Sequence, residues 1–401
     1  MYDFTTIIPR SGMDAIAVDG VGGGGFAPAA PKEGFDVIPM WVADMNFATC
    51  PGVQKSLMER VQHPCYGYFA PQEEYFDSII RWHRDRNGVE GMRPEHIGYE
   101  NGVLGCLVSA VNAFTTPGDG ILLHSPTYIG FTNALKNCGR RIVHSPLVQD
   151  GNGVWRMDYA DMDAKLKQYH IHLAVFCSPH NPCGLVWTRE EIEQAMEVYR
   201  KNDVIVVSDE IWSDIILDEN RHIPTQSVSE DAKKRTIAIY APSKTFNLAG
   251  LVGSYHVIYD PYLRDRVDRQ ALSTHYNMMN VLSMHALMGG YSLEGHLWVD
   301  ELCEVLSGNL HYAADFIRDQ FPGVTTQMPQ GTYMLLLDCE DWCRSRGRTM
   351  DELLKAGWDV GVAWQDGRPF HVPYGIRMNL ALPRSRVEEA MKRLKTYVFQ
   401  D

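Results

Sequence analysis

The fold is decided by two apolar runs that end in polar residues, Leu173-Ala174-Val175-Phe176-Cys177-Ser178 and Val204-Ile205-Val206-Val207-Ser208. Between them, Thr188 precedes Arg189-Glu190-Glu191, which places Glu191 at the capping-box position of a helix. Strands that are buried on both faces are continuously apolar, and a helix between two strands implies parallel pairing. This stretch therefore predicts a strand, a helix and a parallel strand of an α/β fold.

The same alternation extends along most of the chain. Apolar residues recur at spacings of three and four in 53–61, 73–86 and 105–114, which predicts amphipathic helices. Further strands are expected at 120–125, 141–146, 236–240, 332–338 and 375–380, and further helices at 350–357 and 384–399.

The length and the order of these elements predict two domains. The chain has 401 residues, more than the roughly 300 at which a single core stops growing. We expect a large doubly wound domain with a mainly parallel sheet at 49–290 and a smaller α+β domain at 291–401. An N-terminal arm, 1–48, is expected to join the smaller domain.

The composition excludes several classes of protein. The chain has 37 Lys and Arg residues against 50 Asp and Glu residues, a formal charge of −13, and no long basic run. This balance argues against nucleic-acid binding and against a polybasic membrane anchor. No apolar run approaches the roughly 20 residues that span a bilayer, and Met1-Tyr2-Asp3-Phe4 does not resemble a signal peptide, so a cytoplasmic location is expected.

Metal and nucleotide sites are not indicated either. The nine cysteines are scattered, and Cys339 and Cys343, the closest to a pair, lack partners at zinc-site spacing. The glycine run Gly22-Gly23-Gly24-Gly25 lacks the Lys-Ser/Thr of a nucleotide-binding loop. We therefore expect reduced thiols, no metal site and an N-terminal loop.

Polar and aromatic side chains follow four of the expected strands directly. They are Tyr128 after 120–124, Asn181 after 173–178, Asp209 after 204–208 and Lys244 after 236–240. Ligands of doubly wound sheets bind at the carboxyl ends of the strands. A lysine, a carboxylate, an amide and an aromatic ring suit a pyridine-ring aldehyde cofactor. They can respectively form an imine with the aldehyde, hold the ring nitrogen protonated, bind the phenolic oxygen and stack on the ring.

Each of these residues also has a simpler interpretation. Asp209 alone is best explained as the cap of a following helix, and Asn181 before a proline as a turn residue. Lys244 alone is best explained as a solvated lysine, and Tyr128 as a half-buried core aromatic. Their placement at successive strand ends is what favours a common site.

Three motifs resemble the signature of the class I/II aminotransferase superfamily, the fold-type I enzymes that use pyridoxal 5′-phosphate (PLP). These are Asn181-Pro182-x-Gly184, Ser208-Asp209-Glu210-Ile211 and Ser243-Lys244-Thr245-Phe246-Asn247. The resemblance covers nearly the whole chain, as far as Pro383-Arg384-Ser385. No early strand is followed by Gly-x-Gly-x-x-Gly, which argues against a nicotinamide enzyme.

Within the superfamily, the chain is most similar to the cystathionine β-lyase-like carbon–sulfur lyases. Four segments carry this resemblance: Tyr2-Asp3-Phe4-Thr5, Met40-Trp41-Val42-Ala43-Asp44-Met45-Asn46-Phe47, Cys177-Ser178-Pro179-His180-Asn181-Pro182 and Gly184-x-Val186-Trp187. It implies β-elimination that releases a thiol, pyruvate and ammonia from an L-amino acid. The motifs alone leave transamination open, and a regulatory protein that binds the cofactor without turnover is a further alternative, which the intact Lys244 disfavours.

The resemblance also implies roles for the catalytic residues. Lys244 would be the Schiff-base lysine and the base that removes the Cα proton. Asp209 would pair with the pyridinium nitrogen, Asn181 would bind the ring oxygen and adjoin the substrate, and Tyr128 would stack on the ring.

Further residues are implied to bind the phosphate and the substrate. Backbone N–H groups of Gly102-Val103-Leu104, at a helix start, would hold the phosphate with help from the Ser243 hydroxyl. Tyr68 would reach the phosphate of a neighbouring subunit, which implies a homodimer. Arg377 would bind the substrate α-carboxylate, since a guanidinium can hold a carboxylate bidentately.

Three positions depart from the superfamily pattern. Trp212, expected beside the cofactor, stands where relatives often have Tyr or His, and its indole N–H donates but cannot accept a proton. Val252 stands where aspartate aminotransferases have a phosphate-binding arginine. The segment 362–373 lacks the glycine-rich pattern of lyases, although we expect it close to the substrate.

Overall fold

The computed structural model describes residues 1–151, 153–274 and 277–400. Its main sheet has seven strands in the order β2-β10-β9-β8-β7-β3-β4. Their bounds are β2 Ile97–Glu100, β10 Ser254–Val257, β9 Thr236–Tyr240, β8 Ile205–Asp209, β7 Leu173–Cys177, β3 Gly120–Ser125 and β4 Arg141–Pro146. Strands β9, β8, β7, β3 and β4 are mutually parallel, whereas β10 is antiparallel to both of its neighbours. The prediction of an α/β fold with a mainly parallel sheet is confirmed.

The apolar run of β7 is explained by burial on both faces of the sheet. Leu173, Val175 and Cys177 pack into one core cluster, and Ala174 and Phe176 pack into another. Helices α4 (Val103–Phe114), α5 (Ile129–Asn137) and α10 (Pro261–Ser273) cover the first face, and helices α6 (Tyr159–Gln168), α7 (Arg189–Lys201) and α8 (Glu230–Arg235) cover the second. A strand between two such layers has no solvent face, which is why its sequence shows no polar alternation.

The helices of this part include four that the sequence pattern predicts, at 53–61, 73–86, 105–114 and directly after Thr188. They are α2 Pro51–Gln62, α3 Glu73–Asn87, α4 Val103–Phe114, α5 Ile129–Asn137, α6 Tyr159–Gln168, α7 Arg189–Lys201, α8 Glu230–Arg235, α9 Pro242–Thr245, α10 Pro261–Ser273 and α11 Val281–Gly290. The capping box of α7 is confirmed: Glu191 N donates to Thr188 Oγ1 over 3.2 Å, and Thr188 N donates to Glu191 Oε2 over 2.9 Å.

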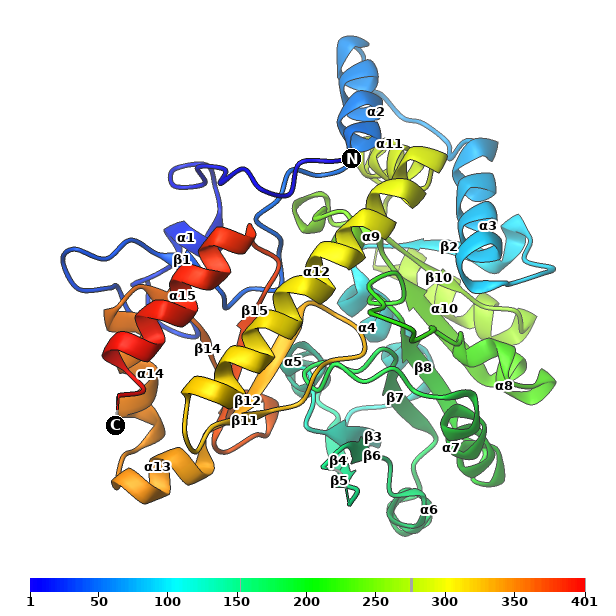
Figure 1. Cartoon of the computed structure of the whole chain (residues 1–401). Coiled ribbons are helices and arrows are strands. Elements are labelled where there is room, and N and C mark those ends of the chain that lie inside the picture. Colours follow the sequence, from blue (N-terminus) through cyan, green and yellow to red (C-terminus); the bar gives the residue numbers. More distant parts are fainter. Residues whose placement is uncertain (152, 275–276, 401) are drawn as a thin grey trace.

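A second, antiparallel sheet has the order β11-β12-β15-β14. Its strands are β11 Thr325–Thr326, β12 Met334–Asp338, β15 Gly375–Asn379 and β14 Gln365–Asp366, and its helices are α13 Glu340–Arg346, α14 Met350–Asp359 and α15 Arg384–Tyr397. Strand β1, Ile38–Pro39, pairs in parallel with β13, Val362–Ala363, so the N-terminal segment lies against this C-terminal part (Figure 1). The domain boundaries at residues 48 and 290 stay a prediction.

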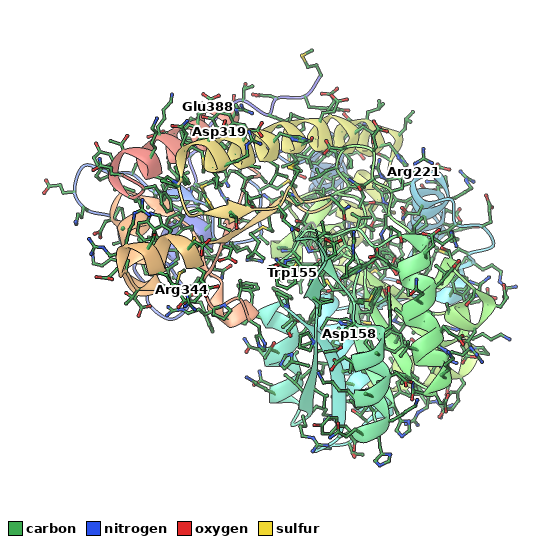
Figure 2. The ribbon with its side chains drawn as sticks, turned by 60° about the horizontal axis from the view of Figure 1, so that its bottom comes forward. Trp155, Asp158, Arg221, Asp319, Arg344 and Glu388 are labelled. Carbon is green, nitrogen blue, oxygen red and sulfur yellow. The ribbon has the colours of Figure 1, made fainter. Side chains whose placement is uncertain are left out.

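Helix α12, Leu293–Gln320, runs from the end of α11 toward the second sheet (Figure 1). It packs against α15. Figure 2 shows the two helices on the same side of the molecule, where Asp319 of α12 and Glu388 of α15 are labelled. Its buried side chains, which include Trp298, Leu302, Leu306 and Leu310, recur at helical spacing. This long helix therefore connects the two sheets through one continuous core cluster.

Several short elements were not predicted from the sequence. They include β1, β13, the hairpin of β5 Val148–Gln149 and β6 Trp155–Arg156, α1 Ile16–Asp19, and the 3₁₀ turns Pro94–His96, Thr225–Ser227, Ala249–Leu251 and Arg368–Phe370. Each is too short to show a periodicity, since its existence depends on pairing or packing with distant segments. No helix among the described residues combines the length and apolar character needed to cross a bilayer.

Candidate active site

A cavity of about 290 Å³ opens at the carboxyl ends of β3, β7, β8 and β9. All of the predicted site residues except Tyr68 and Arg377 line it: Val103, Leu104, Tyr128, Asn181, Asp209, Trp212, Ser243 and Lys244. The remaining lining residues include Ala43, Asn101, Cys177, Ile211 and Val252. The expected convergence at one edge of the sheet is therefore present.

Lys244 lies on α9, is partly buried, and lines this cavity. Its Nζ donates a hydrogen bond to the carbonyl oxygen of Ala43 over 2.7 Å and lies 5.9 Å from the centre of the Trp212 ring. Burial, with a smaller contribution from the Arg377 charge, lowers the pKa of Lys244 to about 8. Because Nζ is bonded to a backbone carbonyl at the cavity, Lys244 is not the solvated surface lysine of the simpler interpretation.

Asp209 is the last residue of β8, and its carboxylate is buried at the cavity. Its Oδ1 accepts a hydrogen bond from Ile211 N over 3.0 Å, but the residues that follow form a turn and no helix for it to cap. Burial raises the pKa of Asp209 to about 7, and the nearby Glu210 charge adds to this effect. A buried carboxyl with this environment suits a cationic partner such as a protonated ring nitrogen.

Glu210, the residue after Asp209, is buried among hydrogen-bond donors. Its carboxylate accepts hydrogen bonds from His222 Nε2 and Tyr240 Oη, each over 2.8 Å, and from Ser208 Oγ over 2.9 Å. Burial alone would raise the pKa of Glu210, but these donors lower it overall. The two consecutive acids thus have pKa values shifted in opposite directions, a contrast that sequence reasoning missed.

Asn181 and Tyr128 form two further parts of the cavity wall. Asn181 Oδ1 accepts a hydrogen bond from Arg377 Nη1 over 3.1 Å, which directs the amide oxygen away from the cavity and leaves Nδ2 as a donor. The Tyr128 ring meets Phe131 edge-on at 5.3 Å. Tyr128 therefore presents a fixed aromatic face, and Asn181 presents an N–H group that can bind a ring oxygen.

Arg377 is buried on β15 beside Asn181 rather than in the cavity wall itself. Its Nη2 donates to the carbonyl oxygen of Trp41 over 3.2 Å and to Gln365 Oε1, and the Phe370 ring lies 4.4 Å from the guanidinium carbon. Burial lowers the pKa of Arg377 to about 10, so it remains a cation at neutral pH. The segment 362–373 is thus in contact with Arg377.

The N-terminus of α4, which we call the cradle, presents its first turn to the cavity. Gly102 precedes it with φ 80° and ψ 154°, a conformation available essentially to glycine only, and no side chain caps the first turn. The first-turn N–H groups of Val103 and Leu104 can therefore bind a phosphate, and Ser243 lies on the same cavity. Val252, with φ 54°, also lines this end, where its apolar side chain offers no charge.

The sequence matches the model of the aminotransferase class I and II family over residues 36–394. The chain belongs to this family. It is 32% identical over 363 residues to cystathionine beta-lyase PatB of Bacillus subtilis, which covers 90% of this chain and 92% of that protein.

Two solved structures of the same fold are lyases or contain PLP. Cystalysin from Treponema denticola, crystallised with a pyridoxal 5′-phosphate cofactor, matches with a TM-score of 0.90 and 30% identity over 99% of this chain and 98% of its own. The PLP-bound C-S lyase from Staphylococcus hominis matches with a TM-score of 0.88 and 28% identity over 98% of both chains.

In this member of the class I/II aminotransferase family, Tyr68 does not line the cavity of its own chain. Its side chain is fully exposed, and it lines a separate groove with Tyr66, Phe69 and Met278. Tyr66 and Met278 are also more than half exposed, so the groove forms an apolar surface patch. Tyr68 therefore does not complete the cavity of its own chain.

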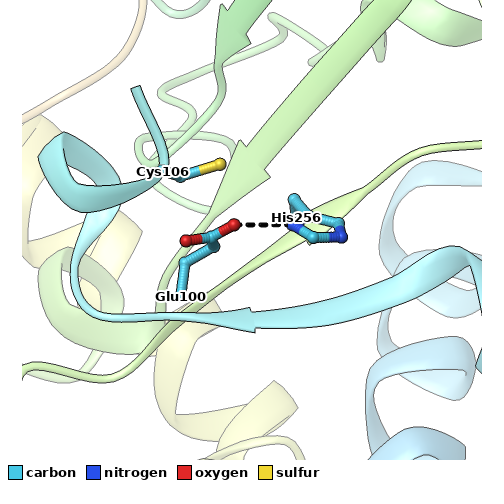
Figure 3. A group of neighbouring side chains, drawn as sticks. All are labelled: Glu100, Cys106 and His256. Atoms are coloured by element: carbon cyan, nitrogen blue, oxygen red, sulfur yellow. Dashed lines mark hydrogen bonds and ion pairs between the residues drawn. The ribbon is translucent and has the colours of Figure 1, made fainter. Parts of the chain in front are cut away.

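A buried polar group lies behind the cradle of this family member (Figure 3). Glu100, Cys106 and His256 each have a side-chain atom of a kind that can bind a metal ion, and these three atoms lie within 4.8 Å of one another. The Glu100 carboxylate is already bound by His256 Nδ1, over 2.9 Å, and by Asn277 Nδ2. Asn277 Oδ1 in turn accepts the Asn101 N–H over 2.9 Å, so the group supports the loop that leads into the cradle.

Sequence reasoning missed four residues that position the charged groups of this site. Ala43 and Trp41 supply backbone acceptors, Gln365 binds Arg377, and Tyr333 donates to the Ala43 oxygen over 3.1 Å. The signals in the sequence are indirect: the segment 40–47 resembles that of lyases, and the segment 362–373 departs from it.

Proposed function

We propose that this chain is a PLP-dependent carbon–sulfur β-lyase that acts on cystathionine or a cysteine conjugate. The observation that carries this proposal is the meeting of Lys244, Asp209 and Asn181 in one cavity beside Arg377. The similarity to a cystathionine beta-lyase and to a C-S lyase supports elimination as the reaction.

The residues of the cavity fit the cofactor group by group. The buried Asp209 carboxyl, with its pKa of about 7, would hold the ring nitrogen as a cation, and Lys244 Nζ would hold the aldehyde carbon. Asn181 Nδ2 would donate to the ring oxygen, and Tyr128 would cover one ring face. The first-turn amides of α4 would bind the phosphate.

Protein groups would carry out binding and proton transfer. Arg377 would bind the substrate α-carboxylate and so fix the Cα–H bond relative to Lys244. Lys244, whose lowered pKa increases its neutral fraction near pH 8, would remove the Cα proton and could return it to the departing sulfur. When bound, the cofactor supplies the electron sink for the negative charge at Cα. The released aminoacrylate then hydrolyses to pyruvate and ammonia.

An assay of cofactor-loaded protein with L-cystathionine tests this function. Equal amounts of pyruvate and thiol, released continuously and without an added 2-oxo acid, are the expected result. L-Alanine, which has no leaving group on Cβ, is the control and should release no ammonia in the absence of a 2-oxo acid. Amino-group transfer to an added 2-oxo acid without thiol release would instead establish an aminotransferase, and binding of the cofactor with neither reaction would favour a regulatory protein.

The active unit is proposed to be a homodimer. The support is the apolar patch around Tyr68, whose ring is fully exposed in one chain although the residue matches the cofactor-contacting tyrosine of relatives. A two-fold partner that covers this patch could place Tyr68 at the cradle of the other subunit. Active monomers with full cofactor occupancy would contradict this assembly.

A further inference from the structure

Gln365 and Arg377 are cross-strand neighbours in the second sheet. Strand β14 pairs with β15 in antiparallel register, with Gln365 directly opposite Arg377. Side chains of directly opposite residues lie on the same face of a sheet. In agreement, Gln365 Oε1 accepts a hydrogen bond from Arg377 Nη2.

This hydrogen bond occupies the part of the guanidinium that a carboxylate needs. A bidentate carboxylate binds either the Nη1/Nη2 edge or the Nε/Nη2 edge, so Nη2 belongs to both. Nη2 has two N–H groups, and its two acceptors are Trp41 O and Gln365 Oε1. Nε, by contrast, is buried without a hydrogen-bond partner.

The two acceptors of Nη2 differ in their freedom to move. Trp41 accepts from Nη2 through its backbone carbonyl, and the Trp41 side chain is buried. Gln365 contributes the end of a flexible side chain, is only partly buried and sits on β14, the edge strand of its sheet. A ligand that needs Nη2 can therefore displace Gln365 more readily than Trp41.

We propose that Gln365 is a displaceable occupant of Arg377, and that the α-carboxylate of the substrate takes its place on Nη2. This inference rests on the proposed function, in which Arg377 binds that carboxylate. Gln365 is then a specificity-determining residue, because a ligand must bind Nη2 more strongly than a neutral amide does. A carboxylate, which forms charge-assisted hydrogen bonds, meets this requirement, and a carboxamide does not.

The identity of the side chain suits this task. A glutamate at position 365 would form an ion pair with Arg377, and this ion pair would compete with every anionic substrate. An apolar residue would leave a buried Nη2 donor unpaired. A neutral amide satisfies the donor in the resting protein and remains weaker than the incoming carboxylate.

The test measures ligand binding without turnover. Holoenzyme is titrated calorimetrically with 3-(methylthio)propionate, a thioether acid that lacks the amino group needed for reaction, and with its carboxamide. Gln365→Ala should bind the acid about 3- to 10-fold more tightly, because one hydrogen bond to a charged group is no longer displaced. Gln365→Glu should bind it at least about tenfold more weakly, and wild-type protein should bind the carboxamide more weakly than the acid.

Two further variants keep the result interpretable. Gln365→Asn, whose shorter amide cannot reach Nη2, should reproduce the effect of Gln365→Ala with a more conservative change. Asp366→Ala, on the same strand but with its side chain bonded to Arg368, should leave the affinity for the acid unchanged.

Unchanged or weaker acid binding by both Gln365→Ala and Gln365→Asn would overturn the inference, since Gln365 would then only support Arg377. Because no turnover is involved, a wild-type protein that releases no pyruvate would refute the proposed function and leave this titration decisive. If the lyase reaction is present, Gln365→Ala should also lower KM with little change in kcat.

Discussion

Nζ of Lys244 lies 2.7 Å from the carbonyl oxygen of Ala43, a residue 201 positions earlier in the chain. The same oxygen accepts the Tyr333 hydroxyl over 3.1 Å, so segments before and after the main sheet meet at the lysine. The position of the lysine therefore depends on the packing of the N-terminal segment and of the residue directly before β12 against the large sheet.

Replacement of the lysine tests its chemical role. Lys244→Ala should lower the rate of pyruvate release by about 10²- to 10⁴-fold, the usual contribution of a general base, and should abolish the covalent attachment of the cofactor. Borohydride reduction followed by mass spectrometry measures that attachment. Lys201→Ala, at an exposed position of α7, is the matched control and should behave as wild type. Undiminished elimination by Lys244→Ala would refute the assignment.

The raised pKa of Asp209 predicts a pH-dependent stability of the cofactor-free protein. A carboxyl with a pKa near 7 when folded and near 3.8 when unfolded destabilises the fold increasingly as the pH rises from about 4 to 7. Asp209→Asn removes this effect. The variant should exceed the wild type in free energy of unfolding by on the order of 2–4 kcal/mol at pH 8, with no advantage near pH 4.

Denaturant unfolding of both proteins at several pH values measures this difference. Saturation with PLP should reduce the advantage of Asp209→Asn, because the wild-type carboxylate then gains a cationic partner. An advantage that is equal at pH 5 and pH 8 would contradict the prediction.

The cradle predicts a specific sensitivity at Gly102. A Cβ at this position would meet only Val252 Cγ1, at 3.8 Å, so space is available. The backbone conformation is nevertheless strained for alanine by about 1–3 kcal/mol. Gly102→Ala should relieve that strain by turning the first-turn amides of α4 away, and PLP affinity, measured by fluorescence titration, should fall about tenfold. Gly118→Ala, also at positive φ but in a turn outside the cavity, should retain wild-type affinity.

Shared sites in a homodimer can be tested by complementation. Tyr68→Ala should keep the fold, because the side chain is exposed, but should weaken PLP binding. Mixed dimers of Tyr68→Ala and Lys244→Ala subunits contain one site with both native residues. Random mixing should therefore restore about a quarter of the wild-type activity. Activity no greater than the sum of the two separate variants would exclude a contribution of Tyr68 across the interface.

The sequence by itself determined the elements whose residues interact with near neighbours. Strands β3 and β4 and the capping box of α7 were predicted at their observed positions, because continuous burial and helix capping leave a local pattern. It also determined which side chains share the sheet edge, since the carboxyl ends of parallel strands lie together. Tyr128, Asn181, Asp209 and Lys244 were found in this way.

Only the tertiary structure decided how these side chains are held. No local pattern predicts the contact of the Ala43 oxygen with Lys244, of the Gln365 amide with Arg377 or of the His222 ring with Glu210. Such contacts depend on how the second sheet and the N-terminal segment pack against the large sheet. Burial in that packing also produced the shifted pKa values of Asp209 and Lys244, because desolvation is a property of the assembled layers and not of any one stretch of sequence.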